Sequence, residues 1–83
     1  MSAKVHPYPA AKHSRIVGAI AREMIAAGSM DAAEKRLIEF LEIHFDRLTM
    51  FGVVDADIVS ECREFAWAAW DAYQQLSREA GVA

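Results

Sequence analysis

The chain has little of what stabilises secreted or membrane proteins. It contains one cysteine, Cys62, so no internal disulfide can form. No apolar run approaches the roughly 20 residues that cross a bilayer. The N-terminus also lacks the continuous apolar stretch and small-residue cleavage site of a secretion signal. We therefore expect a soluble, cytoplasmic protein in a reducing compartment, without a membrane partner.

Proline, glycine and strand-like alternation are also scarce. The two prolines lie together in His6-Pro7-Tyr8-Pro9, and only four glycines punctuate the rest. Nowhere do apolar and polar residues alternate over more than a few positions, which argues against strands. With 83 residues, 54% of them hydrophobic and 25% charged, the chain suits one small folded domain. The sequence predicts an all-α fold.

Two prolines favour extended backbone, so we expect residues 1–9 to form an extended N-terminal arm. Residues 10–83 then form a single three-helix domain. Helical periodicity runs from about Ala10 to Gly28, from Ala32 to about Phe51, and from Asp55 to near Gly81.

Local signals mark the ends of these helices. Gly28 and Gly52 end the first two helices, because glycine readily adopts the left-handed conformation that follows a helix. Ser29 or Asp31 is expected to cap the second helix, and Asp55 the third. Val54 and Val59 have the spacing of a hydrophobic staple around that third start.

Tight turns make successive helices antiparallel neighbours. Three helices of about 20 residues, lying in a single layer, would leave apolar surface uncovered. A two-fold homodimer would cover that surface. The residues expected inside share the apolar arcs of the second and third helices: Leu37, Leu41, Phe45, Leu48, Ile58, Phe65, Ala69 and Leu76.

Charge is divided unevenly along the chain. The first 22 residues carry +4 and no acid, whereas the remainder carries −7, for a net charge of −3. An acidic body repels phosphate backbones, which disfavours nucleic acid as a partner. The basic N-terminal segment is expected to lie against the acidic helices of its own chain. Otherwise it meets an anionic partner through Lys4, Lys12, Arg15 and Arg22.

No catalytic, cofactor or metal motif is complete in the sequence. It has no glycine-rich phosphate loop, no Cys-x-x-Cys and no His-Glu-x-x-His. Cys62 lies within the apolar arc of the third helix, where a thiol usually acts as a small apolar side chain. His44 falls within the apolar arc of the second helix. We expect it to be a core histidine with a hydrogen-bond partner, with a pH-sensitive or interface role as the alternative. We expect no enzymatic activity.

Two groups of apolar residues interrupt the polar sides of the helices. Trp67 falls opposite the apolar arc of the third helix, with Arg63 and Asp71 one turn to either side. Ile43 and Met50, seven residues apart, form a similar stripe on the second helix. Trp, Met and Arg are enriched where proteins meet partners, so these five residues are the expected partner-binding surface.

One resemblance covers most of the chain. Val5-His6-Pro7-Tyr8-Pro9 precedes a basic helix start with Lys12 and Arg15. Ala33-Glu34 then opens a second amphipathic helix, and Gly52-Val53 precedes a third. This order resembles small all-helical proteins of alphaproteobacteria, a family of unknown function with an N-terminal Pro-aromatic-Pro signature. Lys12-His13 stands where a more strongly basic pair is expected. The resemblance implies a bacterial cytoplasmic protein and transfers no catalytic residue.

These features favour a small non-enzymatic protein-interaction module. It would act as a regulator or inhibitor by docking onto a protein partner, and could come from a bacterium, a mobile element or a phage. The alternative is a helix-turn-helix DNA-binding regulator, suggested by the turn from Gly28 to Asp31. Charge argues against that alternative, because the helix that would read the groove carries four acids between Glu34 and Asp46.

Overall fold

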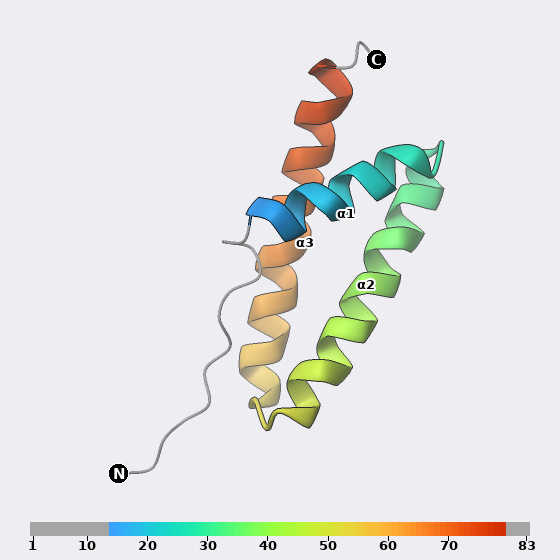
Figure 1. Ribbon diagram of the computed structural model, residues 1–83. Helices are drawn as coiled ribbons and strands as arrows, with labels where there is room; N and C mark the ends of the chain where they lie inside the picture. The colour runs from blue at the N-terminus through green and yellow to red at the C-terminus, as the bar shows by residue number, and fades with distance from the viewer. Residues whose placement is uncertain (1–13, 80–83) are drawn as a thin grey trace.

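The computed structural model describes residues 14–79, which form three helices and no strand (Figure 1). Helix α1 spans Ser14–Ala26, α2 spans Met30–Met50 and α3 spans Asp55–Glu79. The all-α prediction and the order of three helices are confirmed. The predicted arm and the first residues of the predicted first helix lie outside the described residues.

Both turns reverse the chain at a glycine. Gly28 has a φ of 90° and Gly52 a φ of 80°, in the left-handed region that residues with a Cβ rarely adopt. Ser29 is the N-cap of α2, because its hydroxyl oxygen accepts a hydrogen bond from the Ala32 amide at 3.1 Å. The structure thus selects Ser29 over Asp31 as the cap.

Helix α3 begins at Asp55, the residue predicted to be its cap, so the cap itself lies one residue earlier. The Val54 carbonyl accepts hydrogen bonds from the amides of Asp57 and Ile58, at 2.9 and 3.0 Å. Val54 is therefore the flanking residue, and Asp55 is the first residue of the helix. In that first turn the carboxylate still interacts favourably with the helix dipole. Val54 and Val59, the two residues of the predicted staple, both remain exposed.

Helices α2 and α3 form an antiparallel hairpin, and α1 crosses it obliquely and contacts both helices (Figure 1). The three helices therefore do not form the single layer that the turns suggested. Two contacts fix the register of the hairpin. Phe40 stacks on Phe65 with ring centroids 4.7 Å apart, and His44 faces Glu61 one turn further along.

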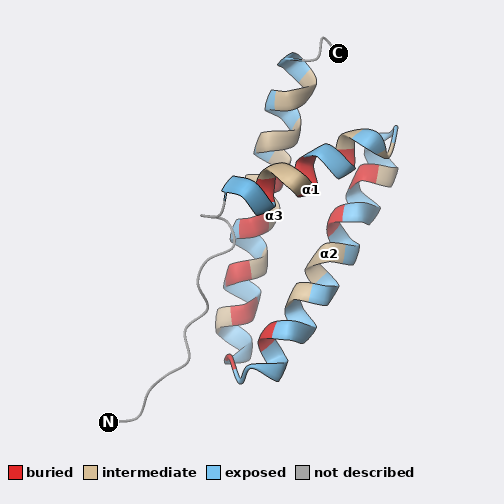
Figure 2. Ribbon diagram, in the orientation of Figure 1, coloured by how far each residue is buried: buried red, intermediate tan, exposed pale blue. Residues whose placement is uncertain are grey.

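The buried core consists of two apolar clusters. Figure 2 shows that buried residues recur along all three helices and at the Gly52 turn. The larger cluster joins all three helices and contains Val17, Ile20, Met24, Ala33, Leu37, Phe65 and Ala69. The smaller cluster, near the Gly52 turn, contains Leu48, Val53 and Ile58. No α1 residue belongs to the smaller cluster, so α1 covers only the half of the hairpin that lies away from that turn.

This partial cover explains where the predicted core is wrong. Five of the eight predicted core residues are buried: Leu37, Leu48, Ile58, Phe65 and Ala69. Leu41 and Leu76 are half-buried. Phe45 is 38% exposed, because its part of α2 packs against α3 alone, whereas the wide apolar arc of α2 requires a second neighbour.

Candidate functional site

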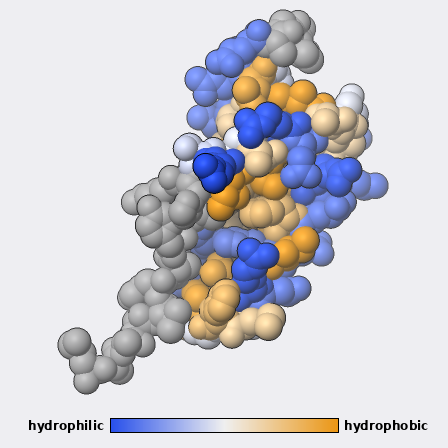
Figure 3. Space-filling model, viewed as in Figure 1, coloured by the Kyte–Doolittle hydropathy of each residue, from blue (hydrophilic) through white to orange (hydrophobic). Residues whose placement is uncertain are grey.

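Large apolar side chains are exposed mainly around the half of the hairpin that α1 leaves uncovered. Six of the ten exposed large apolar residues among residues 14–79 lie between Ile43 and Val59. In Figure 3 apolar side chains form patches that charged side chains separate. Scattered exposed apolar residues are ordinary, but a concentration of them marks a candidate interaction surface.

Trp67 lies on the outer side of α3. Its side chain is 71% exposed, which confirms the position expected from the helical pattern. Arg63 and Asp71, four residues to either side, are also exposed and follow the same side of the helix. We call Trp67, Arg63 and Asp71 the Trp67 face. It combines one large apolar ring with one charge of each sign.

A second surface lies on the outer side of α2. Ile43 and Met50 are 58% and 87% exposed, and Asp46 and Arg47 lie exposed between them. These four residues, which we call the α2 stripe, line an open groove of about 470 Å³ together with Phe51. Ile43 and Met50 were predicted from their spacing. Phe51 was not among the predicted partner-binding residues.

The structure separates the Trp67 face from the α2 stripe, which were predicted as one surface. The register of Phe40 on Phe65 places Trp67 level with Ile38, on a different helix from the stripe. By the same register Met50 lies level with Asp55, about 18 Å further along the hairpin. Trp67 does not line the groove of the α2 stripe. The five predicted partner-binding residues therefore form two surfaces.

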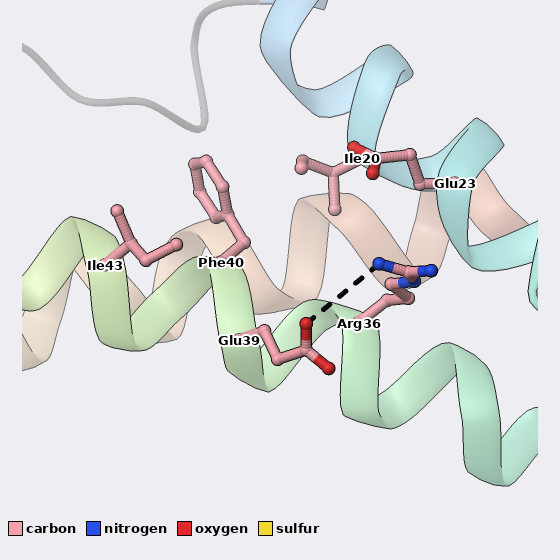
Figure 4. A pocket seen from close by; sticks show the side chains of 6 residues that line it. All are labelled: Ile20, Glu23, Arg36, Glu39, Phe40 and Ile43. Carbon is pink, nitrogen blue, oxygen red and sulfur yellow. Dashed lines mark ion pairs between the residues drawn. The ribbon is translucent and has the colours of Figure 1, made fainter.

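A smaller groove of about 230 Å³ lies between α1 and α2 (Figure 4). Arg36 Nη1 lies 4.0 Å from Glu39 Oε2 at its rim, and both side chains are more than half exposed. An exposed pair at this distance contributes little to stability. The groove is lined by Ile20 and Glu23 of α1 and by Arg36, Glu39, Phe40 and Ile43 of α2. Ile43 thus lines both grooves.

A polar pair separates the two core clusters. His44 Nε2 lies 3.6 Å from Glu61 Oε1, and the two side chains are only 13% and 3% exposed. The His44 Nε2 atom is buried and has no hydrogen-bond partner, whereas the sequence predicted a core histidine with such a partner. The imidazole instead stacks on Phe40, with ring centroids 5.7 Å apart.

Glu61 is a buried residue that the sequence prediction missed. It lies three residues after Ile58 and four before Phe65, a spacing that puts it beside the core face of α3. Because a carboxylate is rarely buried, its residue type predicted an exposed side chain even though its position on the helix favoured burial. Its spacing relative to Ile58 and Phe65 was the signal that could have identified it.

Cys62 follows Glu61 and contacts the smaller cluster. Burial, and to a lesser extent the charge of the neighbouring Glu61 carboxylate, raise the pKa of the Cys62 thiol. The protonated thiol is thereby favoured, which is the opposite of what activates a nucleophilic cysteine. The prediction that Cys62 acts as a small apolar residue agrees with this position.

The basic N-terminal residues fall partly within the described range. Arg15 and Arg22 are exposed on α1, whereas Lys4 and Lys12 lie outside the described residues. Neither arginine has an ion pair within 4.0 Å among residues 14–79. The expected contact of this basic segment with acidic helices or with an anionic partner remains a prediction.

The same residues offer neither a metal-ion site nor a membrane-spanning helix. Between Ser14 and Glu79, no three His, Cys, Asp or Glu side chains are grouped so that they could hold a metal ion. None of the three described helices combines the length and apolar character needed to cross a membrane. Comparison with family models, with curated proteins and with solved structures finds no match to this chain.

Proposed function

We propose that this protein is a small non-enzymatic interaction module that docks onto a protein partner through the Trp67 face, as a regulator or inhibitor of that partner. The observation that supports the proposal is the 71% exposure of Trp67 on the side of α3 that faces away from the core. An indole held in water forgoes burial worth about 2 kcal/mol. A protein partner would restore that burial.

The surroundings of Trp67 match the composition of an interface centre. Tryptophan and arginine are enriched among the residues that dominate binding energies, and charged groups typically surround them at the rim. Arg63 and Asp71 supply such charges, one turn to either side of the indole. The helix supports this arrangement, because its backbone is already ordered before a partner binds.

The positions of the histidine, the cysteine and the buried carboxylate support a non-enzymatic role, and the carboxylates that do line the grooves, Glu23, Glu39 and Asp46, are all exposed. Neither groove on α2 is lined by His44, Glu61 or Cys62. Glu61 is buried and His44 half-buried between the two core clusters, and the pKa of the Cys62 thiol is raised. General acid–base or nucleophilic catalysis requires such a group within hydrogen-bond reach of a substrate.

The helix-turn-helix alternative gains no support from the surface of α2. The charged residues predicted to disfavour it are all exposed: Glu34, Lys35, Arg36, Glu39, Glu42, Asp46 and Arg47. With four acids against three bases, this surface carries no excess positive charge for DNA phosphates. A gel shift at several salt concentrations tests the alternative, and salt-sensitive binding to duplex DNA would favour it.

The proposal is tested by capture from a lysate of the source cell with the immobilised full chain. We expect Trp67→Ala to reduce the captured partner at least about tenfold, because truncation at a binding hot spot weakens association by about 2 kcal/mol or more. Met30→Ala is the matched control, since Met30 is also a large exposed apolar residue but lies at the start of α2. We expect it to retain the partner.

Stability measurements distinguish an interface role from a structural one. Trp67→Ala should leave the melting temperature nearly unchanged, because the side chain makes little contact with the core. A melting temperature lowered by several degrees, with the partner still captured, would show that Trp67 stabilises the fold instead. Equal capture by Trp67→Ala and Met30→Ala would refute the proposal.

A further inference from the structure

We propose that the α2 stripe binds the α2 stripe of a second copy of this chain, with the two helices parallel about a two-fold axis. This proposal concerns a different surface from the Trp67 face, and it stands independently of the proposed function. It assigns an occupant to the groove formed by Ile43, Asp46, Arg47, Met50 and Phe51.

The helix places the four stripe residues on one side. Residues seven apart nearly coincide around an α-helix, so Ile43 and Met50 form the apolar centre of the stripe. Asp46 lies about 50° to one side of this centre and Arg47 about 50° to the other. The centre is therefore apolar, with a negative edge and a positive edge.

The same division of charge continues along α2. Glu39 and Glu42 fall on the edge of Asp46, whereas Arg36 falls on the edge of Arg47. Each of these residues is exposed. Between Arg36 and Met50 the outer side of α2 thus has acids along one edge and bases along the other, whereas Lys35, one residue earlier, lies on the acidic edge.

This pattern is self-complementary in only one orientation. A two-fold axis parallel to the helices brings the negative edge of one copy against the positive edge of the other. Asp46 then faces Arg47 of the second copy, twice by symmetry, while Ile43 meets Ile43 and Met50 meets Met50. An antiparallel pair would place Asp46 against Asp46 and Arg47 against Arg47, and like charges at an interface are destabilising.

The surrounding structure leaves this surface accessible. Helix α1 contributes no residue to the core cluster beneath this part of the hairpin, and Met50 is 87% exposed. Because Met50 is long and flexible, it can occupy the groove beside Ile43 of the second copy. One pair of helix faces buries less area than a standard interface, so we expect a dimer with a high-micromolar dissociation constant.

Sedimentation equilibrium of the full chain, from low micromolar to near-millimolar concentration, tests the proposal. We expect a reversible monomer–dimer equilibrium in the wild type. Asp46→Arg and Arg47→Asp should each weaken the dimer at least about tenfold, because each substitution places like charges opposite one another at two positions. The double variant D46R/R47D should restore the dimer to within about threefold of the wild type.

Each other outcome overturns the proposal. A monomer at every concentration would mean that something other than a second copy occupies the groove. A dimer that the single substitutions leave intact would be formed by another surface. Single variants that dissociate without rescue in D46R/R47D would exclude the parallel pairing. We expect all three variants to fold, since the two positions are exposed. Circular dichroism and thermal melts check this for each variant.

The Trp67→Ala variant separates this proposal from the proposed function. It should dimerise like the wild type, because Trp67 does not line the groove. A charge-swap rescue without any captured partner would support the dimer and leave the docking function refuted. Partner capture that depends on Trp67, in a chain that remains monomeric, would support the docking function and refute the dimer.

Discussion

The two phenylalanines Phe65 and Phe45 show at the residue scale how packing distinguishes chemically identical side chains. Phe65 is fully buried and stacks on Phe40, whereas Phe45 is 38% exposed on the part of α2 that α1 does not cover. Removing a buried ring loses the full transfer free energy of the ring and leaves a cavity. Removing an exposed ring loses only part of the transfer free energy and leaves no cavity.

We therefore predict different losses of stability for the two truncations. Phe65→Ala should lower the free energy of unfolding by about 3 to 5 kcal/mol, and Phe45→Ala by about 1 kcal/mol or less. Urea denaturation followed by circular dichroism measures both. Equal losses would show that the larger cluster does not extend around Phe65 as described.

The pair Glu61 and Cys62 gives a second prediction at this scale. Burial is the larger cause of the raised pKa of the Cys62 thiol, and the charge of Glu61 is the smaller one. Glu61→Gln removes only the charge. We expect it to lower the pKa of Cys62 without returning it to the ordinary value of 9.0. The pH dependence of alkylation by iodoacetamide measures this shift, and an unchanged profile would contradict it.

The same raised pKa makes stability depend on pH in the alkaline range. Above the ordinary value of 9.0, the unfolded chain releases the thiol proton before the folded chain does. The contribution of Cys62 to stability is thus fully present below that value and is lost as the pH rises through the pKa of the folded state. Cys62→Ala should therefore reduce the loss of stability that occurs as the pH rises in the alkaline range. Denaturant melts across this pH range measure the difference between the variant and the wild type.

The sequence predicts the burial or exposure of some residues and not of others. Exposure of Trp67, Ile43 and Met50 was predictable, because an apolar residue among polar ones on a helix has no internal neighbour. The burial of Glu61 and the exposure of Phe45 were not. Each depends on which part of the hairpin α1 covers, and helical periodicity contains no information about a crossing helix.

At the scale of elements, the turns decide where each helix begins and ends. The φ of 80° at Gly52 lets the chain turn from α2 into α3, and a built Cβ there would meet no other atom within 4 Å. Backbone conformation alone therefore disfavours any other residue. Gly18, in contrast, lies inside α1, where a Cβ would meet Arg22 at an ordinary distance of 3.5 Å.

We predict opposite effects of alanine at these two glycines. Gly52→Ala should destabilise the fold by about 1 kcal/mol, since alanine is strained in the left-handed region. Gly18→Ala should stabilise it by about 0.5 to 1 kcal/mol, because alanine is the better helix former. Thermal melts compare the two variants directly. Stabilisation by Gly52→Ala would mean that the turn differs from the one described.

The helices themselves were largely predictable from the sequence. Ser29, Gly28 and Gly52 are local signals, and local hydrogen bonds and backbone preferences determine helix ends. The one-residue error at Val54 arose because Asp is a more frequent cap than Val. The crossing of α1 over both other helices was not predictable, because it depends on side-chain packing between distant segments.

At the scale of the whole molecule, a core in two clusters leaves one end of the hairpin thinly covered. Helix α1 completes the larger cluster, and the smaller one rests on Leu48, Val53 and Ile58. The exposed apolar residues follow from this division, as most lie beside the smaller cluster. Neither the division nor the separation of the Trp67 face from the α2 stripe could be read from the sequence, since both require the packed arrangement.

The central claim, that the Trp67 face meets a protein partner, is tested most directly by photo-crosslinking. A photoreactive phenylalanine analogue replaces Trp67 in the full chain, and a control chain carries it in place of Met30. After illumination in a lysate of the source cell, mass spectrometry identifies the adducts. We predict one defined protein joined at the Trp67 position and absent from the control. Adducts with this chain alone, or the same proteins joined at both positions, would contradict the claim.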